Sequence, residues 1–312
     1  MKKTALLFPG QGSQSVGMGQ DLYEEFGFVR ELFDMAEDLT RLNLKRLCFN
    51  GPMDALTQTV NLQPAVTVVN LACLETLRAE GRRPAVTAGH SLGEYAALHA
   101  ADAITAENTL RLVFKRGQLM HREAQKHTGA MHAVLGLPYD KVSRLVKAGQ
   151  TNGVVSVANH NTEQQIVITG EPSAVAAVSA MVVENGGKSI PLKVSGAWHS
   201  ELIRGAEGEF KAYLADVEFR PPAIGVLFNV TADYESDPEV IRDVMARQLC
   251  SPVRWFDIMC RLMDEKVEVF AEIGPGKVLA GLLRKTLPKD YPGKVCNVFD
   301  LKSFESFLQE TA

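Results

Sequence analysis

Apolar residues in the first part of the chain follow two different spacings. The runs TALLFPG (residues 4–10) and PAVTAG (84–89) are short, apolar and end in a glycine, which is typical of a buried strand that enters a turn. Strands that alternate with helices in this region indicate a mainly parallel sheet. The predicted helices repeat apolar residues at intervals of three and four, and they are residues 21–39, 67–81, 92–101 and 106–125.

The middle of the chain has a different order of elements. It reads β-α-β-β-α-β, the split βαβ arrangement of ferredoxin-like modules. We therefore expect residues 128–195 to form a small ferredoxin-like subdomain, inserted into a larger one made of residues 1–127 and 196–312. The predicted elements are strands at 129–137, 154–161, 164–170 and 188–195, and helices at 138–149 and 172–187.

After the insertion the first pattern resumes. We expect an α/β fold in which this last part completes the mainly parallel sheet of the large subdomain. Its predicted elements are strands at 223–230 and 267–274, and helices at 237–249, 252–267 and 277–285.

Composition is that of an ordinary globular enzyme, with 46% hydrophobic and 22% charged residues among 312. A net charge of −4 argues against nucleic acid as a partner. The apolar run at the N-terminus stops at Pro9, and no run approaches the roughly 18 residues that span a membrane, so we expect a cytoplasmic protein without membrane contact. The five cysteines are scattered as in a reduced protein, and no metal-binding motif is present, so no metal is expected.

Ser91 lies between two glycines in GHSLG (89–93), after a predicted strand and before a predicted helix. This matches G-x-S-x-G, the strand–turn–helix corner called a nucleophile elbow. A serine in so sharp a turn needs small neighbours, and the Leu92 N–H at the start of the helix can stabilise an oxyanion. The same pattern also arises by chance, or with the serine as a simple helix N-cap.

A serine hydroxyl becomes a strong nucleophile only when a base accepts its proton, and the chain has seven histidines. His90 is adjacent to Ser91, but its side chain should point away at the corner. His160 lies in the polar stretch NHNTE, where we expect a loop. His199 stands where the chain leaves the predicted insertion, and clefts form at such junctions. The pattern alone leaves open whether His199 is catalytic or ordinary.

Six motifs occur in a single order along the chain: FPGQGSQSVGMG, GHSLGEYAA, KRG, VSGAWHS, RQLCSPVRW and EIGPGKVL. In this order and spacing the chain resembles the malonyl-CoA:acyl carrier protein transacylases, from about residue 5 to residue 285. The resemblance implies a hydrolase-like α/β core with a ferredoxin-like insertion. It also implies transfer of a malonyl group from malonyl-CoA to the phosphopantetheine thiol of an acyl carrier protein.

The resemblance assigns roles in catalysis to five residues. It implies that Ser91 is the nucleophile and His199 its base, and that Gln248 orients His199. Gln11 is expected to join the Leu92 N–H in the oxyanion hole.

Three further residues are expected to shape the acyl pocket. The resemblance implies that Arg116 binds the free carboxylate of the malonyl group, which suits the bidentate fork of a guanidinium. Asn159 is expected to line the same cleft. Trp198 departs from the family, in which phenylalanine, serine or a small residue is usual at this position. If Trp198 faces the cleft it leaves little room for an α-methyl branch, and the alternative is a tryptophan that only fills the core.

The sequence therefore predicts a monomeric acyltransferase that forms an acyl-serine intermediate and has malonyl-CoA and an acyl carrier protein as partners. No bound cofactor is expected, because the phosphopantetheine arrives on the partner protein. Two alternatives stay open: a serine esterase or thioesterase acting on carboxylated acyl thioesters, and a non-catalytic module that docks a carrier protein. The sequence does not distinguish fatty acid synthesis, polyketide synthesis and malonate decarboxylation.

Overall fold

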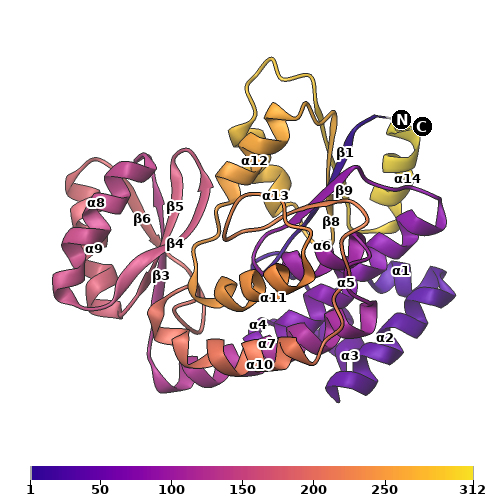
Figure 1. The fold of residues 1–312 in the computed structure, drawn as a ribbon, viewed down its shortest axis with the longest axis horizontal. Coiled ribbons are helices and arrows are strands. Elements are labelled where there is room, and N and C mark those ends of the chain that lie inside the picture. Colours follow the sequence, from indigo (N-terminus) through magenta and orange to yellow (C-terminus); the bar gives the residue numbers. More distant parts are fainter. Residues whose placement is uncertain (1, 312) are drawn as a thin grey trace.

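The larger part of the molecule is built around one five-stranded sheet in the computed structural model, which describes residues 2–311 (Figure 1). Its strands are β1 Thr4–Phe8, β2 Val86–Gly89, β7 Gly225–Leu227, β8 Val269–Ile273 and β9 Lys294–Val298. They lie in the order β7-β2-β1-β8-β9, and every neighbouring pair is parallel. The segments that follow these strands therefore meet at one edge of the sheet, where ligand sites of parallel α/β folds form.

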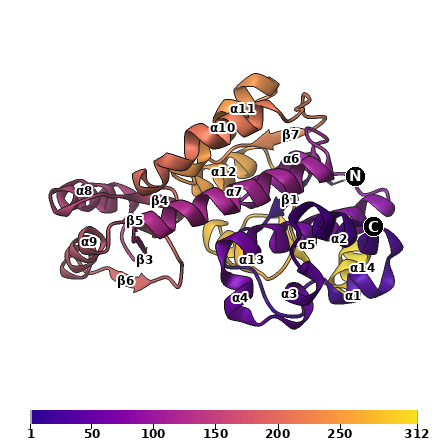
Figure 2. The same cartoon turned by 90° about the horizontal axis from the view of Figure 1, so that it is seen from below.

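Helices surround this sheet, and none of them within residues 2–311 combines the length and apolar character needed to cross a membrane. The long helix α7 runs past the sheet towards the inserted part of the chain (Figure 2). Before the insertion the helices are α1 Gln20–Glu25, α2 Gly27–Thr40, α3 Leu44–Asn50, α4 Met53–Thr57, α5 Thr59–Ala79, α6 Gly93–Ala100 and α7 Ala106–Lys126. After it they are η2 Glu201–Ala206, α10 Glu207–Ala215, α11 Pro238–Arg247, η3 Gln248–Cys250, α12 Trp255–Asp264, α13 Val278–Thr286 and α14 Leu301–Glu310.

The central strand β1 contributes to two separate layers of core. Leu6 and Phe8 belong to the larger apolar cluster, which includes residues of α2, α5, α6 and α7. Ala5 and Leu7 belong to the other cluster, which includes residues of α12 and α13. Helices therefore cover both faces of the sheet, and this is why β1 is apolar at successive positions rather than at alternate ones.

The inserted part forms a second sheet, antiparallel throughout, with the helices α8 (Tyr139–Gly149) and α9 (Pro172–Glu184) beside it (Figure 1). Residues of these strands and helices form an apolar core of their own. Its elements are β3 Ala130–Leu135, α8 Tyr139–Gly149, η1 Gln150–Asn152, β4 Val155–Thr162, β5 Gln165–Gly170, α9 Pro172–Glu184 and β6 Lys188–Pro191. The strand order β4-β5-β3-β6 is that of a ferredoxin-like module. The predicted fold class, an α/β core with a ferredoxin-like insertion, is confirmed.

The chain enters and leaves the insertion at one point. A Cβ placed on Gly129 would lie 2.5 Å from the Ala197 Cβ, so the two connecting segments touch. A close entry and exit allow a unit to be inserted without disturbing the sheet that carries it. We propose residues 128–195 as the small subdomain and residues 1–127 with 196–312 as the large one.

The predicted helix at 21–39 is wrong in one respect, because the chain breaks it into α1 and α2. Phe26 is extended, with φ −105° and ψ 127°, and its ring packs edge-on against Phe304 with centroids 6.2 Å apart. Arg30 donates to the main-chain oxygens of Tyr23 and Glu24 and so satisfies the end of α1. Aromatic packing against α14 therefore overrides the local helical periodicity.

Several elements were not predicted. Strand β9 extends the sheet beside β8, and α14 covers its end with a capping box formed by Asp300 and Ser303. The predicted strand at 188–195 is shorter than expected, because β6 ends at Pro191. Helices α3, α4 and α10 are also additions to the predicted set. All of these are short, and short elements give weak periodic signals.

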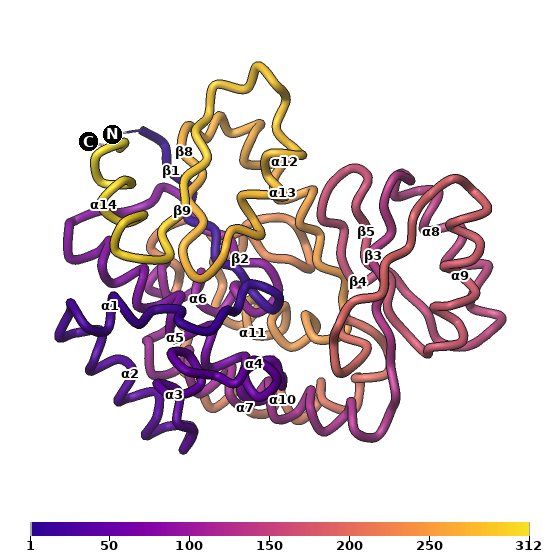
Figure 3. Tube along the Cα trace, turned by 180° about the vertical axis from the view of Figure 1, so that it is seen from behind, coloured from indigo at the N-terminus to yellow at the C-terminus, as the bar shows by residue number. Residues whose placement is uncertain are grey.

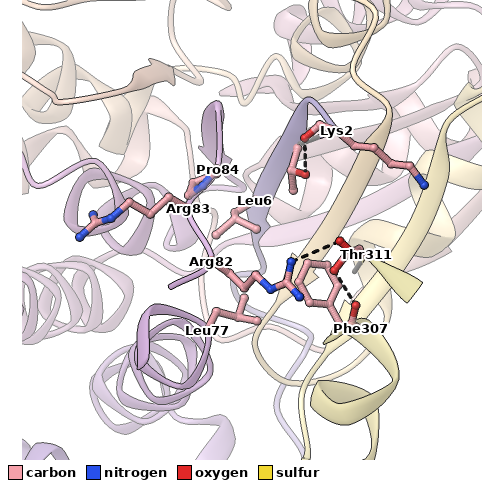
Figure 4. A pocket seen from close by; sticks show the side chains of 9 residues that line it. Lys2, Leu6, Leu77, Arg82, Arg83, Pro84, Phe307 and Thr311 are labelled. Carbon is pink, nitrogen blue, oxygen red and sulfur yellow. Dashed lines mark hydrogen bonds between the residues drawn. The ribbon is translucent and has the colours of Figure 1, made fainter. Parts of the chain in front are cut away.

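The two ends of the described chain lie close together beside β1 and α14 (Figure 3). A small pocket at this place is lined by Leu77, Arg82 and Phe307, among others (Figure 4). Arg82 donates to the main-chain oxygen of Thr311 (Figure 4) and to that of Leu308, and both acceptors lie at the end of α14. This pocket contains none of the predicted site residues, and its arginine has a structural role as a helix cap.

We expect Gly93→Ala to destabilise the fold. A Cβ at Gly93 would lie far inside contact distance of the main-chain carbonyl of Phe8, which belongs to the central strand. Overpacking against backbone should lower the free energy of unfolding by about 3 kcal/mol, measured by urea titration. Gly208→Ala is the matched control, because Gly208 is exposed on α10 with no neighbour within 4 Å. It should be neutral or stabilising, and equal losses in the two variants would contradict the argument.

Candidate active site

One cleft, lying at the carboxyl ends of β1 and β2, collects most of the residues that the sequence singled out. Its lining includes seven of the eight predicted site residues: Gln11, Ser91, Leu92, Arg116, Asn159, Trp198 and His199. The eighth, Gln248, is fully buried and lies behind His199. Segments far apart in the sequence thus converge on one place.

Ser91 occupies the corner between β2 and α6 with φ 51°, the left-handed region that side chains other than glycine rarely adopt. This conformation costs roughly 1–2 kcal/mol for a non-glycine residue. The neighbouring glycines are explained by space. A Cβ on Gly89 would collide with the main chain of Gly93, and one on Gly93 would collide with the main chain of Phe8. The sequence pattern therefore marks a real strand–turn–helix elbow.

Ser91 and His199 are in direct contact, with 2.8 Å between Ser91 Oγ and His199 Nε2. On the other side of the ring, His199 Nδ1 lies 2.9 Å from the main-chain oxygen of Gln248. A carbonyl only accepts, so Nδ1 carries the hydrogen and Nε2 is free to accept the serine proton. Burial, together with the nearby Arg116 guanidinium, lowers the pKa of His199 to about 3, so the imidazole is neutral at neutral pH.

Gln248 holds the pair from two directions. Its main-chain carbonyl fixes the His199 ring, while its side-chain Nε2 donates to the main-chain oxygen of Ser91 at 2.9 Å. Its Oε1 accepts from Arg116 at 3.2 Å. The contact with His199 therefore uses a backbone atom, which a substitution at Gln248 would leave in place.

Arg116 is 2% exposed and yet forms no ion pair with any carboxylate in the described part of the chain. Its guanidinium donates to Gln63 Oε1 at 3.0 Å and to Ser91 Oγ at 3.1 Å, and it lies over the Tyr95 ring at 5.7 Å. Burial lowers its pKa, in keeping with a charge removed from water. A buried cation without an anion is costly, and it marks a site that is completed by an anionic group.

The loop that carries Gln11 packs directly on the elbow. A Cβ on Gly10 would lie 2.5 Å from the main-chain oxygen of His90 and 3.4 Å from the Leu92 nitrogen. Asn70 donates to the Pro9 carbonyl at 3.0 Å and anchors the start of this loop from α5. Gln11 and Leu92 therefore border the same cleft as the Ser91 hydroxyl.

Trp198 and Asn159 border the cleft from the side of the insertion. Trp198 is 4% exposed, belongs to the main apolar core and also lines the cleft. The edge of its ring packs against Gly196. Asn159 sits at an irregularity in β4 and pairs with Val253 of the large subdomain.

Two further histidines, His160 and His90, are held by neighbouring side chains. His160 lies within strand β4 and not in a loop, and it is stacked between Tyr139 and Phe256 at 4.7 and 4.9 Å. The loop expected at His160 is therefore wrong, whereas the predicted strand at 154–161 is right: β4 continues to Thr162, and rings from α8 and α12 pack on the imidazole. His90 points away from Ser91, as expected, and its Nε2 lies 2.8 Å from Asn161 Oδ1.

Three buried polar residues around the elbow carry no recognisable signal in the sequence. Asn229 follows β7 and bonds to the main chain of the elbow, Glu94 lies in the first turn of α6, and Gln63 supports Arg116 from α5. All three are at most 1% exposed. An acidic residue in the first turn of a helix normally faces water, so no signal distinguished Glu94 as buried. Asn229 lies inside the predicted strand at 223–230, and nothing in the local pattern marks its side chain as a partner of the elbow.

A serine at a strand–helix elbow, with a neutral imidazole on its hydroxyl, defines the class of serine-nucleophile α/β enzymes. A family model described as "Acyl transferase domain" matches residues 5–303, and the chain belongs to this acyl transferase family.

Individual proteins resemble the chain over nearly its whole length. A malonyl CoA-acyl carrier protein transacylase of Bacillus subtilis (strain 168) is 41% identical over 287 residues, covering 91% of this chain and 90% of that protein. The crystal structure of an acyl carrier protein S-malonyltransferase from Vibrio cholerae superposes with a TM-score of 0.93 at 38% identity, covering 98% and 99% of the two chains. A malonyl-transacylase solved in complex with its type II PKS acyl-carrier protein superposes with a TM-score of 0.94 at 34% identity, covering 99% of each.

We expect Glu94→Gln to change how stability depends on pH. Burial raises the pKa of Glu94 to about 8, whereas an unfolded glutamate titrates near its ordinary value of about 4.5. The stabilising contribution of the protonated carboxyl is therefore complete below about pH 4.5 and is lost as the pH rises towards 8. Glutamine does not titrate, so the stability of the variant relative to wild type should rise between pH 5 and pH 8, measured by urea titration at each pH.

Glu209→Gln is the control for this measurement. Ion pairs with Lys115 and Arg122 lower the pKa of Glu209 to about 2, so its contribution is complete above about pH 4.5 and is lost only in acid. The stability difference between this variant and wild type should stay constant from pH 5 to pH 8. A constant difference for Glu94→Gln as well would contradict the raised pKa.

Proposed function

We propose that this protein transfers a malonyl group from malonyl-CoA to the phosphopantetheine thiol of an acyl carrier protein, through a malonyl ester on Ser91. The observation that carries the proposal is the buried Arg116, which touches the Ser91 hydroxyl and has no carboxylate partner among residues 2–311. A malonyl ester of Ser91 carries a free carboxylate one methylene beyond its carbonyl, within reach of this guanidinium. The pairing would compensate the buried charge by charge-assisted hydrogen bonds. The names of the relatives, malonyl CoA-acyl carrier protein transacylase among them, support the same donor and acceptor.

In the first half-reaction His199 Nε2 accepts the Ser91 proton while Oγ attacks the thioester carbonyl of malonyl-CoA. The tetrahedral oxyanion is stabilised by the Leu92 N–H and by Gln11, and each such donor contributes about 3 kcal/mol. When the intermediate collapses, the C–S bond breaks, and CoA leaves with the proton that His199 held. Malonate stays on Ser91 as an ester, with its carboxylate on Arg116.

In the second half-reaction the phosphopantetheine thiol of the carrier protein takes the place of CoA. His199 accepts the thiol proton, the sulfur attacks the ester carbonyl, and Ser91 leaves with the proton returned from His199. The structure of a relative in complex with its acyl-carrier protein supports this acceptor. The small subdomain supplies Asn159 to the cleft, and Trp198 narrows the same space beside the acyl group.

The groups that carry this chemistry are a hydroxyl, an imidazole, a guanidinium and amides of the chain itself, so the proposal includes no bound cofactor. We also propose a monomeric protein of the cytoplasm, where malonyl-CoA and carrier proteins are available. The five cysteines, all without disulfide partners, fit a reducing compartment.

A labelling experiment tests the proposed function against its alternatives. Incubation with radioactive malonyl-CoA should give a malonyl adduct that survives denaturation, is absent in Ser91→Ala, and is chased onto holo carrier protein. If free malonate is still released faster than malonyl is transferred to added carrier protein, a thioesterase is favoured. Absence of any adduct would favour a non-catalytic docking module.

We expect Arg116→Ala to affect malonyl loading selectively. Without the guanidinium the malonyl carboxylate has no cation in the pocket, so kcat/KM for malonyl-CoA should fall by about 100-fold or more, as expected for loss of a charge-assisted pair of roughly 3 kcal/mol. Acetyl-CoA has no carboxylate and should lose much less. Arg111→Ala is the control, because Arg111 lies on the same helix but is exposed and paired with Glu107. Equal losses for both substrates would show that Arg116 does not bind the carboxylate.

We expect kcat/KM for malonyl-CoA to stay level as the pH falls from 7 to 5. His199 in the free enzyme has a pKa lowered to about 3 and remains neutral in this range. A base with the ordinary histidine pKa of about 6.5 would lose roughly 30-fold at pH 5. Because Arg116 contributes to the low pKa, Arg116→Ala should move the acid limb to higher pH. A wild-type limb near pH 6.5 would contradict the low pKa.

A further inference from the structure

All polar groups of Asn229 form hydrogen bonds, and its side-chain amide bonds to the main chain of the elbow. Its Oδ1 accepts the Ser91 N–H at 2.7 Å, and its Nδ2 donates to the Gly89 main-chain oxygen at 2.7 Å. Its own N–H donates to Glu94 Oε2 at 2.7 Å, and its carbonyl accepts from the Arg254 N–H at 3.1 Å. The residue is fully buried, so each of these bonds is made away from water.

The two side-chain bonds span the corner of the elbow. Gly89 is the last residue of β2, and Ser91 is the residue with the left-handed backbone. One planar amide thus fixes the distance and orientation between a carbonyl before the corner and an N–H within it. Gln248 Nε2 holds the Ser91 carbonyl from the opposite direction, so the main chain of the serine is fixed on both sides by side-chain amides.

The bond to Asn229 also decides which amides face the reacting carbonyl. The Ser91 N–H is already donated to Oδ1, so it is not available to an oxyanion. The Leu92 N–H borders the cleft instead. Glu94 helps to hold Asn229 in place, because its fully buried carboxyl accepts the main-chain N–H of Asn229.

We propose that Asn229 is a positioning residue for acyl transfer: its side-chain amide holds Ser91 in the left-handed conformation that aims Oγ at His199. This inference rests on the proposed function of Ser91 as the nucleophile. The bond that the Ser91 hydroxyl donates to His199 is lost when Oγ becomes an ester, because the ester carries no hydrogen on Oγ. The bond from the Ser91 N–H to Asn229 involves the main chain and persists, so the same side chain positions the acyl-serine for the second half-reaction.

Single-turnover acylation by malonyl-CoA tests the proposal. In Asn229→Ala the limiting acylation rate should fall by about 10- to 100-fold, because a displacement of Oγ by about 1 Å can cost two orders of magnitude. The half-saturating concentration of malonyl-CoA should stay within about twofold, since Arg116 is untouched. A merely structural residue would lower the amount of folded enzyme without changing the limiting rate per folded molecule.

Asn229→Asp gives a second readout, and it also serves if the alanine variant does not fold. The introduced carboxylate can accept the Ser91 N–H but repels the Gly89 carbonyl, and its protonated form can donate to that carbonyl as the amide does. Its acylation rate relative to wild type should therefore be low at pH 8 and rise as the pH falls to 5.5. Asn297→Ala is the control, because Asn297 is a partly buried amide on β9 that bonds to Glu272 and does not line the cleft.

The outcomes separate this inference from the proposed function. A wild-type acylation rate in Asn229→Ala, or an equal loss in Asn229→Asp at every pH, would overturn the role of Asn229. If the wild-type protein forms no malonyl-serine, the proposed function fails instead. In that case the rate of inactivation by a sulfonyl fluoride replaces the acylation rate, because this reaction also requires an activated Ser91. The same criteria then apply to the Asn229 variants.

Discussion

The left-handed backbone of Ser91 is the constraint on which the rest of the site depends. It turns the hydroxyl outwards at the end of β2, and the sharp corner leaves no room for a Cβ two positions before or after the serine, at Gly89 and Gly93. It also leaves an N–H and a carbonyl that the adjoining strand and helix do not fully satisfy. The amides of Asn229 and Gln248 bond to these groups from two later segments of the chain. A strained conformation persists only where its surroundings determine it from several directions, as they do here.

The electrostatics of the cleft follow from what surrounds Arg116. The nearest acid, Glu94, has a pKa raised to about 8 by burial and is largely neutral at neutral pH. His199 is oriented by a main-chain carbonyl and not by a carboxylate, so no negative charge lies on either side of the serine. The guanidinium is thus the one uncompensated charge beside Ser91 in the described structure. Burial, and after it this guanidinium, lowers the pKa of His199 and keeps the imidazole neutral. A carboxylated acyl group would, when it binds, compensate the charge of Arg116 and so weaken its effect on the pKa of His199.

The small subdomain completes the cleft. β4 bonds to the large subdomain through main-chain contacts with Val253, and His160 fills the joint between Tyr139 and Phe256. These contacts fix the position of Asn159 relative to Ser91. The insertion begins and ends beside Gly129 and Ala197, two residues before His199. The junction therefore places the imidazole, which explains why a histidine at the end of an insertion lies opposite a serine 108 positions away.

The sequence by itself determined the elements with strong local signals. The apolar runs defined β1 and β2, the β-α-β-β-α-β order defined the insertion, and the glycines around Ser91 defined the elbow, because backbone sterics act between near neighbours. Tertiary structure alone decided the rest. The break at Phe26 depends on α14, the packing of the His160 ring depends on two aromatic rings, and the contacts of Asn229 and Glu94 depend on segments more than 130 residues apart. Burial and hydrogen bonding of such residues are properties of packing between distant segments, and no periodicity along the chain encodes them.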